Sequence, residues 1–357
     1  MLKPNKLKKG DKVAVISLSN GILGEQYCEH QLKIGAKRLE NMGLEPIFMS
    51  NSLKGKEFLE NNPEKKYEDL VDAFENKEIK AIICAIGGFD SYKILPFLFN
   101  NDKFKKIVSE NPKIFIGFSD TTINHLAFYK LGLKTYYGHS FLVDFAELEN
   151  DMLKFTKKSF LNFFKKSRAF FLESSPFWYE ERKGFGKDQI GVKRIVHKEN
   201  KGFEFYGQNK IVNGILLGGC LDTIYEGMIG KNFPDQKEIC EKYNIFLDEE
   251  SWKNKILFLE TSEEKPLPDE FEKMLIELDM RSILKNVNAI IFGKPQDECF
   301  YEEYKDLLLY YCKKYDTPIV FNLNFGHSFP KTIIPYGFQA EIDFKNRIIK
   351  IKEGLVN

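Results

Sequence analysis

Short apolar runs alternate with amphipathic segments over the first 131 residues, and this alternation restricts the fold more than any other feature. Between the apolar runs, apolar residues recur at the three-to-four-residue spacing of helices. The strands expected from these runs are 12–18, 46–49, 81–86 and 114–118. Such alternation is typical of a parallel sheet covered by helices on both faces. We therefore expect an α/β fold with an N-terminal doubly wound parallel-sheet domain, whose ligands bind at the carboxyl ends of the strands.

The pattern changes near residue 150. A basic, aromatic stretch at 151–167 predicts a connecting helix, 174–181 predicts a loop, and the glycine-rich stretch 214–222 predicts an apolar turn. Later strands with helices between them, and a terminal hairpin around 345–346, indicate a second, mixed α/β domain. The domains expected are 1–150, a connecting segment 151–175, and a C-terminal domain 176–357.

Composition excludes several classes of partner. The 53 basic and 52 acidic residues give a net charge of +1, so no strong field favours a nucleic acid polymer or an anionic membrane. We identify neither a signal peptide nor an apolar run long enough to span a bilayer. The six cysteines are scattered, without metal-ligand spacing, which favours free thiols in a reducing cytoplasm over disulfides or zinc.

The segment 114–122 predicts a buried strand, a tight turn and the start of a helix. Ser119 lies at the junction, beside the free N–H groups and the positive end of the next helix. A serine nucleophile is often placed there, because those N–H groups can hold an oxyanion. On this segment alone, helix capping is the favoured explanation of a serine at this position. The pair Gly87-Gly88 also follows a strand, either as a packing turn or as a backbone N–H presented to a substrate.

Two further polar residues follow apolar strands: Glu260 and His327. A buried carboxylate needs a partner, and a histidine held by a carboxylate can activate a serine. Each residue also has a structural explanation, Glu260 in a lysine pair and His327 in a turn. His125 and His139 compete for the role of base, but a helical offset of six residues points His125 away from Ser119.

Six short motifs in one order resemble the LD-carboxypeptidase and microcin-immunity family of serine peptidases. They occupy 7–15, 86–88, 116–122, 257–260, 325–327 and 334–337, so the resemblance covers nearly the whole chain. It implies an active site in the cleft between the two domains, and a cytoplasmic, homodimeric enzyme that needs no metal or other cofactor.

The resemblance also implies a role for each motif residue. It makes Ser119 the nucleophile, His327 the general base and Glu260 the group that orients the histidine. Backbone N–H groups of Gly88 and Asp120 would form the oxyanion hole.

The substrate is less closely defined by the motifs. Gly87 is expected to approach the substrate, and Trp178, in an aromatic loop similar to that of the microcin-immunity branch, is expected to stack on a nucleobase. The murein-cleaving branch has an arginine after the glutamate strand that 264–270 lacks, and Cys220 replaces a frequent asparagine. A peptidyl- or aminoacyl-nucleotide is therefore the favoured substrate of a serine carboxypeptidase or amidase. A murein tetrapeptide is the alternative, and a non-catalytic binding module for a peptide or nucleotide is the alternative from another class.

Overall fold

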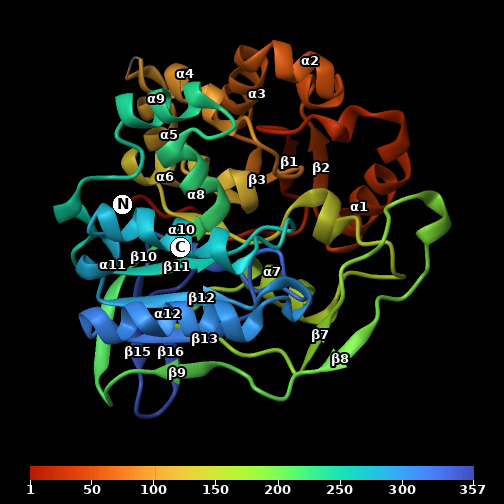
Figure 1. The fold of residues 1–357 in the computed structure, drawn as a ribbon. Helices are drawn as coiled ribbons and strands as arrows, with labels where there is room; N and C mark the ends of the chain where they lie inside the picture. The colour runs from red at the N-terminus through yellow and green to blue at the C-terminus, as the bar shows by residue number, and fades with distance from the viewer. Residues whose placement is uncertain (101) are drawn as a thin grey trace.

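The computed structural model describes residues 1–100 and 102–357, which form two α/β halves (Figure 1). The first half, red to yellow, carries a six-stranded sheet, and the C-terminal half carries an eight-stranded sheet. The two-domain α/β architecture expected from the sequence is confirmed. Within the described residues, no helix combines the length and apolar character needed to cross a membrane.

The N-terminal sheet has the order β14-β5-β4-β3-β1-β2, in which β1 to β5 are parallel and β14 is antiparallel. The order reverses between β1 and β3, which is where doubly wound sheets bind ligands. Its strands are β1 Lys12–Ile16, β2 Glu45–Phe48, β3 Ile79–Cys84, β4 Ile114–Gly117, β5 Thr135–Tyr137 and β14 Ile334–Tyr336. Its helices are α1 Glu29–Asn41, α2 Lys56–Asn61, α3 Pro63–Glu75, α4 Leu95–Phe99, α5 Lys103–Glu110 and α6 Thr122–Lys130.

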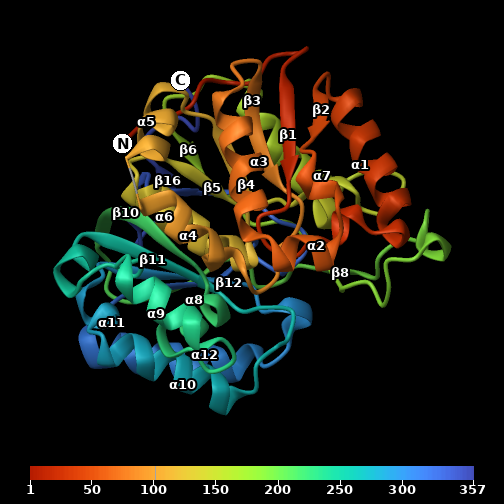
Figure 2. The same ribbon diagram turned by 90° about the horizontal axis from the view of Figure 1, so that it is seen from above.

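The C-terminal sheet is mixed, with four parallel strands, β10 to β13, between antiparallel ones. Its strands, in spatial order, are β6 Phe170–Phe171, β16 Ile348–Ile351, β15 Gln339–Asp343, β10 Ile211–Cys220, β11 Lys255–Glu260, β12 Ala289–Gly293, β13 Ile319–Leu323 and β9 Glu204–Tyr206. The helices of this half are α8 Leu221–Ile229, α9 Pro234–Lys242, α10 Pro268–Met280, α11 Ile283–Asn286 and α12 Tyr301–Tyr315. Figure 2 shows α10 and α12 along the outer face of this sheet.

A small ribbon, β7 Phe177–Tyr179 paired with β8 Val196–Lys198, extends beside the two sheets. It follows α7, Lys154–Leu161, which lies within the connecting helix expected at 151–167. The expected loop at 174–181 is thus partly a strand, because its aromatic residues pair with a partner that is distant in sequence.

The glycine-rich stretch 214–222 is not a turn, as the sequence had suggested. It forms the end of β10 and the start of α8. Gly218 has a φ of 148°, and a Cβ there would lie 1.7 Å from the carbonyl oxygen of Phe258 on the neighbouring strand. The glycine therefore permits a close approach of two strands rather than a reversal of the chain.

Candidate active site

Ser119 lies in the turn between β4 and α6. Its φ of 65° is uncommon for a residue other than glycine, and such strained residues cluster at functional sites. Gly87, which follows β3, approaches so closely that a Cβ on residue 87 would lie 2.8 Å from Ser119 Oγ. The hydroxyl therefore lies at the carboxyl edge of the N-terminal sheet, and the backbone around it has little room to move.

Asp120 fixes the turn that carries Ser119. Its buried carboxylate accepts hydrogen bonds from the Ser19 hydroxyl at 2.5 Å and from the Ser91 N–H at 2.9 Å. Burial raises the pKa of Asp120 although both bonds oppose the shift. The Asp120 N–H belongs to the first turn of a helix, where N–H groups lack partners within the helix. Gly88, with a φ of 149°, lies against Ser19 on the other side of the same cavity edge.

Glu260 ends β11 and holds His327 in one orientation. Its Oε2 accepts hydrogen bonds from Nδ1 of His327 at 2.7 Å and from the His327 backbone N–H at 3.1 Å. The loop can close over this carboxylate because residue 326 is a glycine, with a φ of 77°, whose Cβ would lie 2.3 Å from the Glu260 side chain. With Nδ1 bound to Glu260, Nε2 is the nitrogen left to face the cavity.

Tyr137 connects the two halves of the site. Its hydroxyl donates to Oε1 of Glu260 at 2.5 Å and accepts a hydrogen bond from the Ser119 N–H at 3.1 Å. Burial and the neighbouring Glu260 raise the pKa of Tyr137, so its hydroxyl keeps its proton. Sequence reasoning missed this residue, because a tyrosine at the end of a short apolar strand looks like an ordinary core residue.

Glu263, which the sequence analysis also missed, occupies the second nitrogen of His327. Its Oε2 lies 2.9 Å from Nε2, while half of the Glu263 side chain is exposed. Burial alone would lower the pKa of His327, but Glu260 and Glu263 outweigh burial and raise it to about 10. His327 is therefore an imidazolium between two carboxylates. Among the described residues, Nε2 is bonded to Glu263 rather than to Ser119.

One cavity of about 520 Å³ receives these groups from both halves of the chain. The N-terminal half contributes Gly87, Gly88, Ser119 and Asp120, and the C-terminal half contributes Cys220, Asp222, Glu263 and His327. The structure thus brings the predicted nucleophile and base to the same cavity, with Glu260 beneath the histidine. The site is therefore built from two domains, and both domains can be compared with known proteins.

Two family models match the two halves in order. They are described as LD-carboxypeptidase N-terminal domain, over residues 13–138, and LD-carboxypeptidase C-terminal domain, over residues 213–342. The chain belongs to the peptidase S66 family. The peptidases of this family are hydrolases, and the chain's curated relatives include carboxypeptidases.

The relatives of this S66 chain come from both branches of the family. The structure of an MccF-like protein from Streptococcus pneumoniae in complex with AMP is 42% identical, with a TM-score of 0.90 over 96% of this chain and 98% of that chain. The microcin C7 self-immunity protein MccF of Escherichia coli is 27% identical over 89% of this chain and 87% of its own length. A probable murein peptide carboxypeptidase of Bacillus subtilis is 24% identical over 99% of this chain and 95% of its own.

The competing histidines lie outside the cavity. His125 contacts Thr135 and the Gly117 carbonyl with its two ring nitrogens, at 2.8 and 2.9 Å. His139 is fully buried beside Phe145 and Phe160. Burial lowers the pKa of both imidazoles to about 4. They are structural residues of the N-terminal half.

Cys220 stands beside Glu260 on the neighbouring strand β10. The donor atoms of Cys220, Glu260 and His327 lie within 4.8 Å of one another, so together they could hold a metal ion. Such an ion would have to separate Nδ1 of His327 from the Glu260 carboxylate, because these two groups are already bonded to each other. The geometry therefore fits an oriented histidine better than a metal centre.

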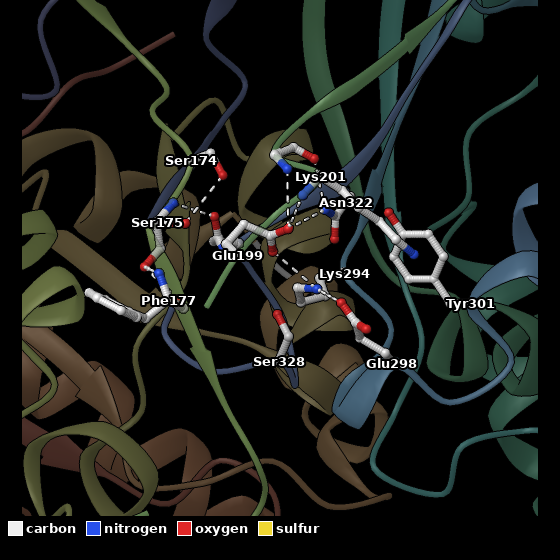
Figure 3. A network of polar contacts seen from close by, with 12 residues as sticks. Ser174, Ser175, Phe177, Glu199, Lys201, Lys294, Glu298, Tyr301, Asn322 and Ser328 are labelled. Atoms are coloured by element: carbon white, nitrogen blue, oxygen red, sulfur yellow. Dashed lines mark hydrogen bonds and ion pairs between the residues drawn. The ribbon is translucent and has the colours of Figure 1, made fainter. Parts of the chain in front are cut away.

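Trp178 does not line the cavity that contains Ser119. Its ring stacks on His197 in the paired strand β8, with ring centroids 4.1 Å apart. Figure 3 shows how the ribbon is anchored nearby: Glu199 accepts the Lys201 N–H and faces the buried ammonium of Lys294, 3.1 Å away. The Trp178 ring therefore already contacts another side chain of the protein, that of His197.

Proposed function

We propose that this chain is a serine carboxypeptidase or amidase that cleaves amide bonds through an acyl-enzyme. Ser119 is the nucleophile, His327 the general base and Glu260 the residue that orients the histidine. The observation that carries this proposal is the bond between Glu260 and Nδ1 of His327, in the same cavity as a serine on a strained turn. A carboxylate that fixes the tautomer of a histidine beside a serine is the arrangement that serine hydrolases share.

In the first step, which starts from the neutral form of His327, Ser119 Oγ attacks the carbonyl carbon while its proton passes to Nε2 of His327. In this proposal the N–H groups of Gly88 and Asp120 stabilise the oxyanion, because both residues line the cavity that contains Ser119. The carbon–nitrogen bond then breaks as His327 gives its proton to the leaving nitrogen. Water attacks the resulting ester with His327 again as base, which releases the acid and restores the Ser119 hydroxyl.

We further propose that the substrate is a peptidyl- or aminoacyl-nucleotide. Support comes from relatives in the microcin-immunity branch: the Streptococcus pneumoniae protein is in complex with AMP, and MccF structures hold aspartyl sulfamoyl adenosine and glutamyl sulfamoyl guanosine. The murein tetrapeptide is the second candidate, because the Bacillus subtilis relative aligns over 99% of this chain.

The test is a comparison of a peptidyl-nucleotide and a murein tetrapeptide with the same purified protein. We expect hydrolysis of the nucleotide substrate, and loss of all turnover in the Ser119→Ala variant with unchanged melting temperature. Wild-type turnover in that variant would reject the proposed nucleophile. Faster cleavage of the tetrapeptide would assign the chain to the murein substrate instead.

A further inference from the structure

Glu263 is bonded to the nitrogen of His327 that the proposed reaction needs as its base. Nε2 of His327 has one hydrogen, and that hydrogen lies toward Glu263 at 2.9 Å. The proposed reaction needs the same nitrogen to take the proton of Ser119. Glu263 must therefore leave His327 before attack, and half of its side chain is already exposed to solvent.

A carboxylate that leaves His327 needs a new partner. Within residues 1–100 and 102–357, His327 is the cation with which Glu263 forms an ion pair. The nearby acidic groups that line the cavity, Asp222, Glu264 and Glu270, would repel it. Burial alone would raise the pKa of Glu263, but His327 and, to a smaller extent, Lys331 lower it to about 2.

We propose that Glu263 selects substrates whose acyl residue carries a positively charged side chain, such as the ε-amine of lysine. The substrate cation takes the place of His327 as the partner of Glu263. Without this carboxylate beside it, the imidazolium releases its Nε2 proton to water, and the free Nε2 then accepts the proton of Ser119. This inference rests on the proposed function and specifies the charge of the substrate for that reaction. Glu263 is in this account a residue that determines specificity.

Lysines in the same cavity wall would give the opposite preference. Lys231, Lys273 and Lys331 line the cavity, and the Lys331 ammonium lies over the Phe329 ring. Lys331 is fully buried, its ammonium lies 3.7 Å from the Asp144 carboxylate, and its Nζ has no hydrogen-bond partner among the described residues. If these cations decided the charge of the substrate, an acidic ligand would bind more tightly than a basic one.

The test uses two ligands that differ in the charge of their side chain, lysyl sulfamoyl adenosine and glutamyl sulfamoyl adenosine. Calorimetry on the Ser119→Ala variant measures binding without turnover. We expect the lysyl compound to bind about tenfold more tightly, which corresponds to about 1.4 kcal/mol. Adding Glu263→Gln should reduce the difference to less than about threefold. Tighter binding of the glutamyl compound, or an unchanged lysyl preference in the double variant, would overturn the proposal.

A control separates Glu263 from net charge, and a second measurement separates this inference from the proposed function. Glu272→Gln removes one exposed carboxylate on α10 outside the cavity, so the lysyl preference should remain. Labelling of the wild type by a fluorophosphonate, mapped by mass spectrometry, reports on Ser119 as nucleophile. Absence of labelling would reject the proposed function, whereas labelling without the lysyl preference would reject only the role of Glu263.

Discussion

The two halves of the site are built in different ways. On the N-terminal side, backbone contacts fix Ser119: a strained φ, the close approach of Gly87 and the buried carboxylate of Asp120. On the C-terminal side, side chains hold the base, because Glu260 binds Nδ1 of His327 and Glu263 binds Nε2. In the proposed mechanism, the nucleophile is therefore ready before substrate arrives, whereas the base becomes available only after Glu263 has moved.

This difference suggests where substrate recognition is coupled to chemistry. A preorganised oxyanion hole and nucleophile lower the barrier for any substrate that enters. A base that is held by an exposed carboxylate responds to the charge of the substrate. Variants in the first half should therefore reduce turnover of every substrate, and variants of Glu263 should change the pH dependence and the choice of substrate.

The largest effect is expected from loss of the base. His327→Gln should reduce kcat by about 10⁴-fold, because Ser119 then has no group to accept its proton. Glutamine keeps a donor for Glu260, which limits the destabilisation. His197→Gln, at a half-exposed position outside the cavity, should retain normal kcat. A kcat within tenfold of wild type in His327→Gln would contradict the assignment of the base.

Gly87→Ala tests the rigid half. A Cβ at this position would lie 2.7 Å from Ser119 Cβ, so the serine turn must shift. We expect kcat to fall by about 100-fold, since small displacements of reacting groups have effects of this size, with about 1–3 kcal/mol of lost stability from overpacking. The control is Gly184→Ala, because a Cβ on residue 184 meets no atom within 4 Å. Normal turnover in Gly87→Ala would show that the backbone of the turn is adaptable.

The Glu263→Gln variant tests the C-terminal side of the site through the pH dependence of kcat/KM. His327 has a pKa raised to about 10, so the free enzyme should gain kcat/KM as pH rises toward 10 and the imidazolium loses its proton. The variant removes one of the carboxylates near His327 and leaves Glu260 and Asp222, so this rise should occur at lower pH. With a neutral substrate, kcat/KM at pH 7 should increase about tenfold for each pH unit of displacement. An unchanged profile would mean that Glu263 does not control the base.

The raised pKa of His327 also affects stability: as pH rises, stability should fall while kcat/KM increases. Because the pKa of His327 is raised on folding, its ion pairs stabilise the fold fully below pH 6.5. That stabilisation is lost as pH rises from 6.5 to about 10. Melting temperatures of wild type and Glu263→Gln should therefore converge over this interval.

The sequence predicted the positions of the reacting groups better than their state. Glu260 and His327 lie at the carboxyl ends of parallel strands of the C-terminal sheet, where periodicity indicates a common edge. Ser119 follows a strand of the other sheet, so only the resemblance to the peptidase family brought the three residues together. The competition at Nε2 could not be predicted in this way. Glu263 lies three residues beyond its strand in a run of acidic residues, where a solvated charge is the ordinary interpretation.

Two parts of the fold depended on contacts that are distant in sequence. Strand β14 leaves the C-terminal half and joins the N-terminal sheet beside β5, which no local pattern indicates. Gly218 and Gly219 looked like a turn, because their place in a strand depends on the neighbouring backbone and on Thr122. The sequence therefore predicted the helices and strands, but not every contact between segments that are distant in sequence.

The smallest effect is expected at Trp178. Its ring stacks on His197 and lies outside the cavity, so Trp178→Ala should raise KM for a nucleotide substrate by no more than about threefold. Stacking of a base on an aromatic ring contributes about 1–3 kcal/mol. An increase of tenfold or more, measured beside Phe177→Ala as control, would support the nucleobase contact that the sequence suggests.

The most direct measurement of the central claim is the rate at which a fluorophosphonate labels Ser119. We expect one label per chain, mapped to Ser119, with faster labelling in Glu263→Gln and almost none in His327→Gln. Labelling at another residue, or equal rates in the wild type and His327→Gln, would contradict the convergence of Ser119, His327 and Glu260 in one catalytic site.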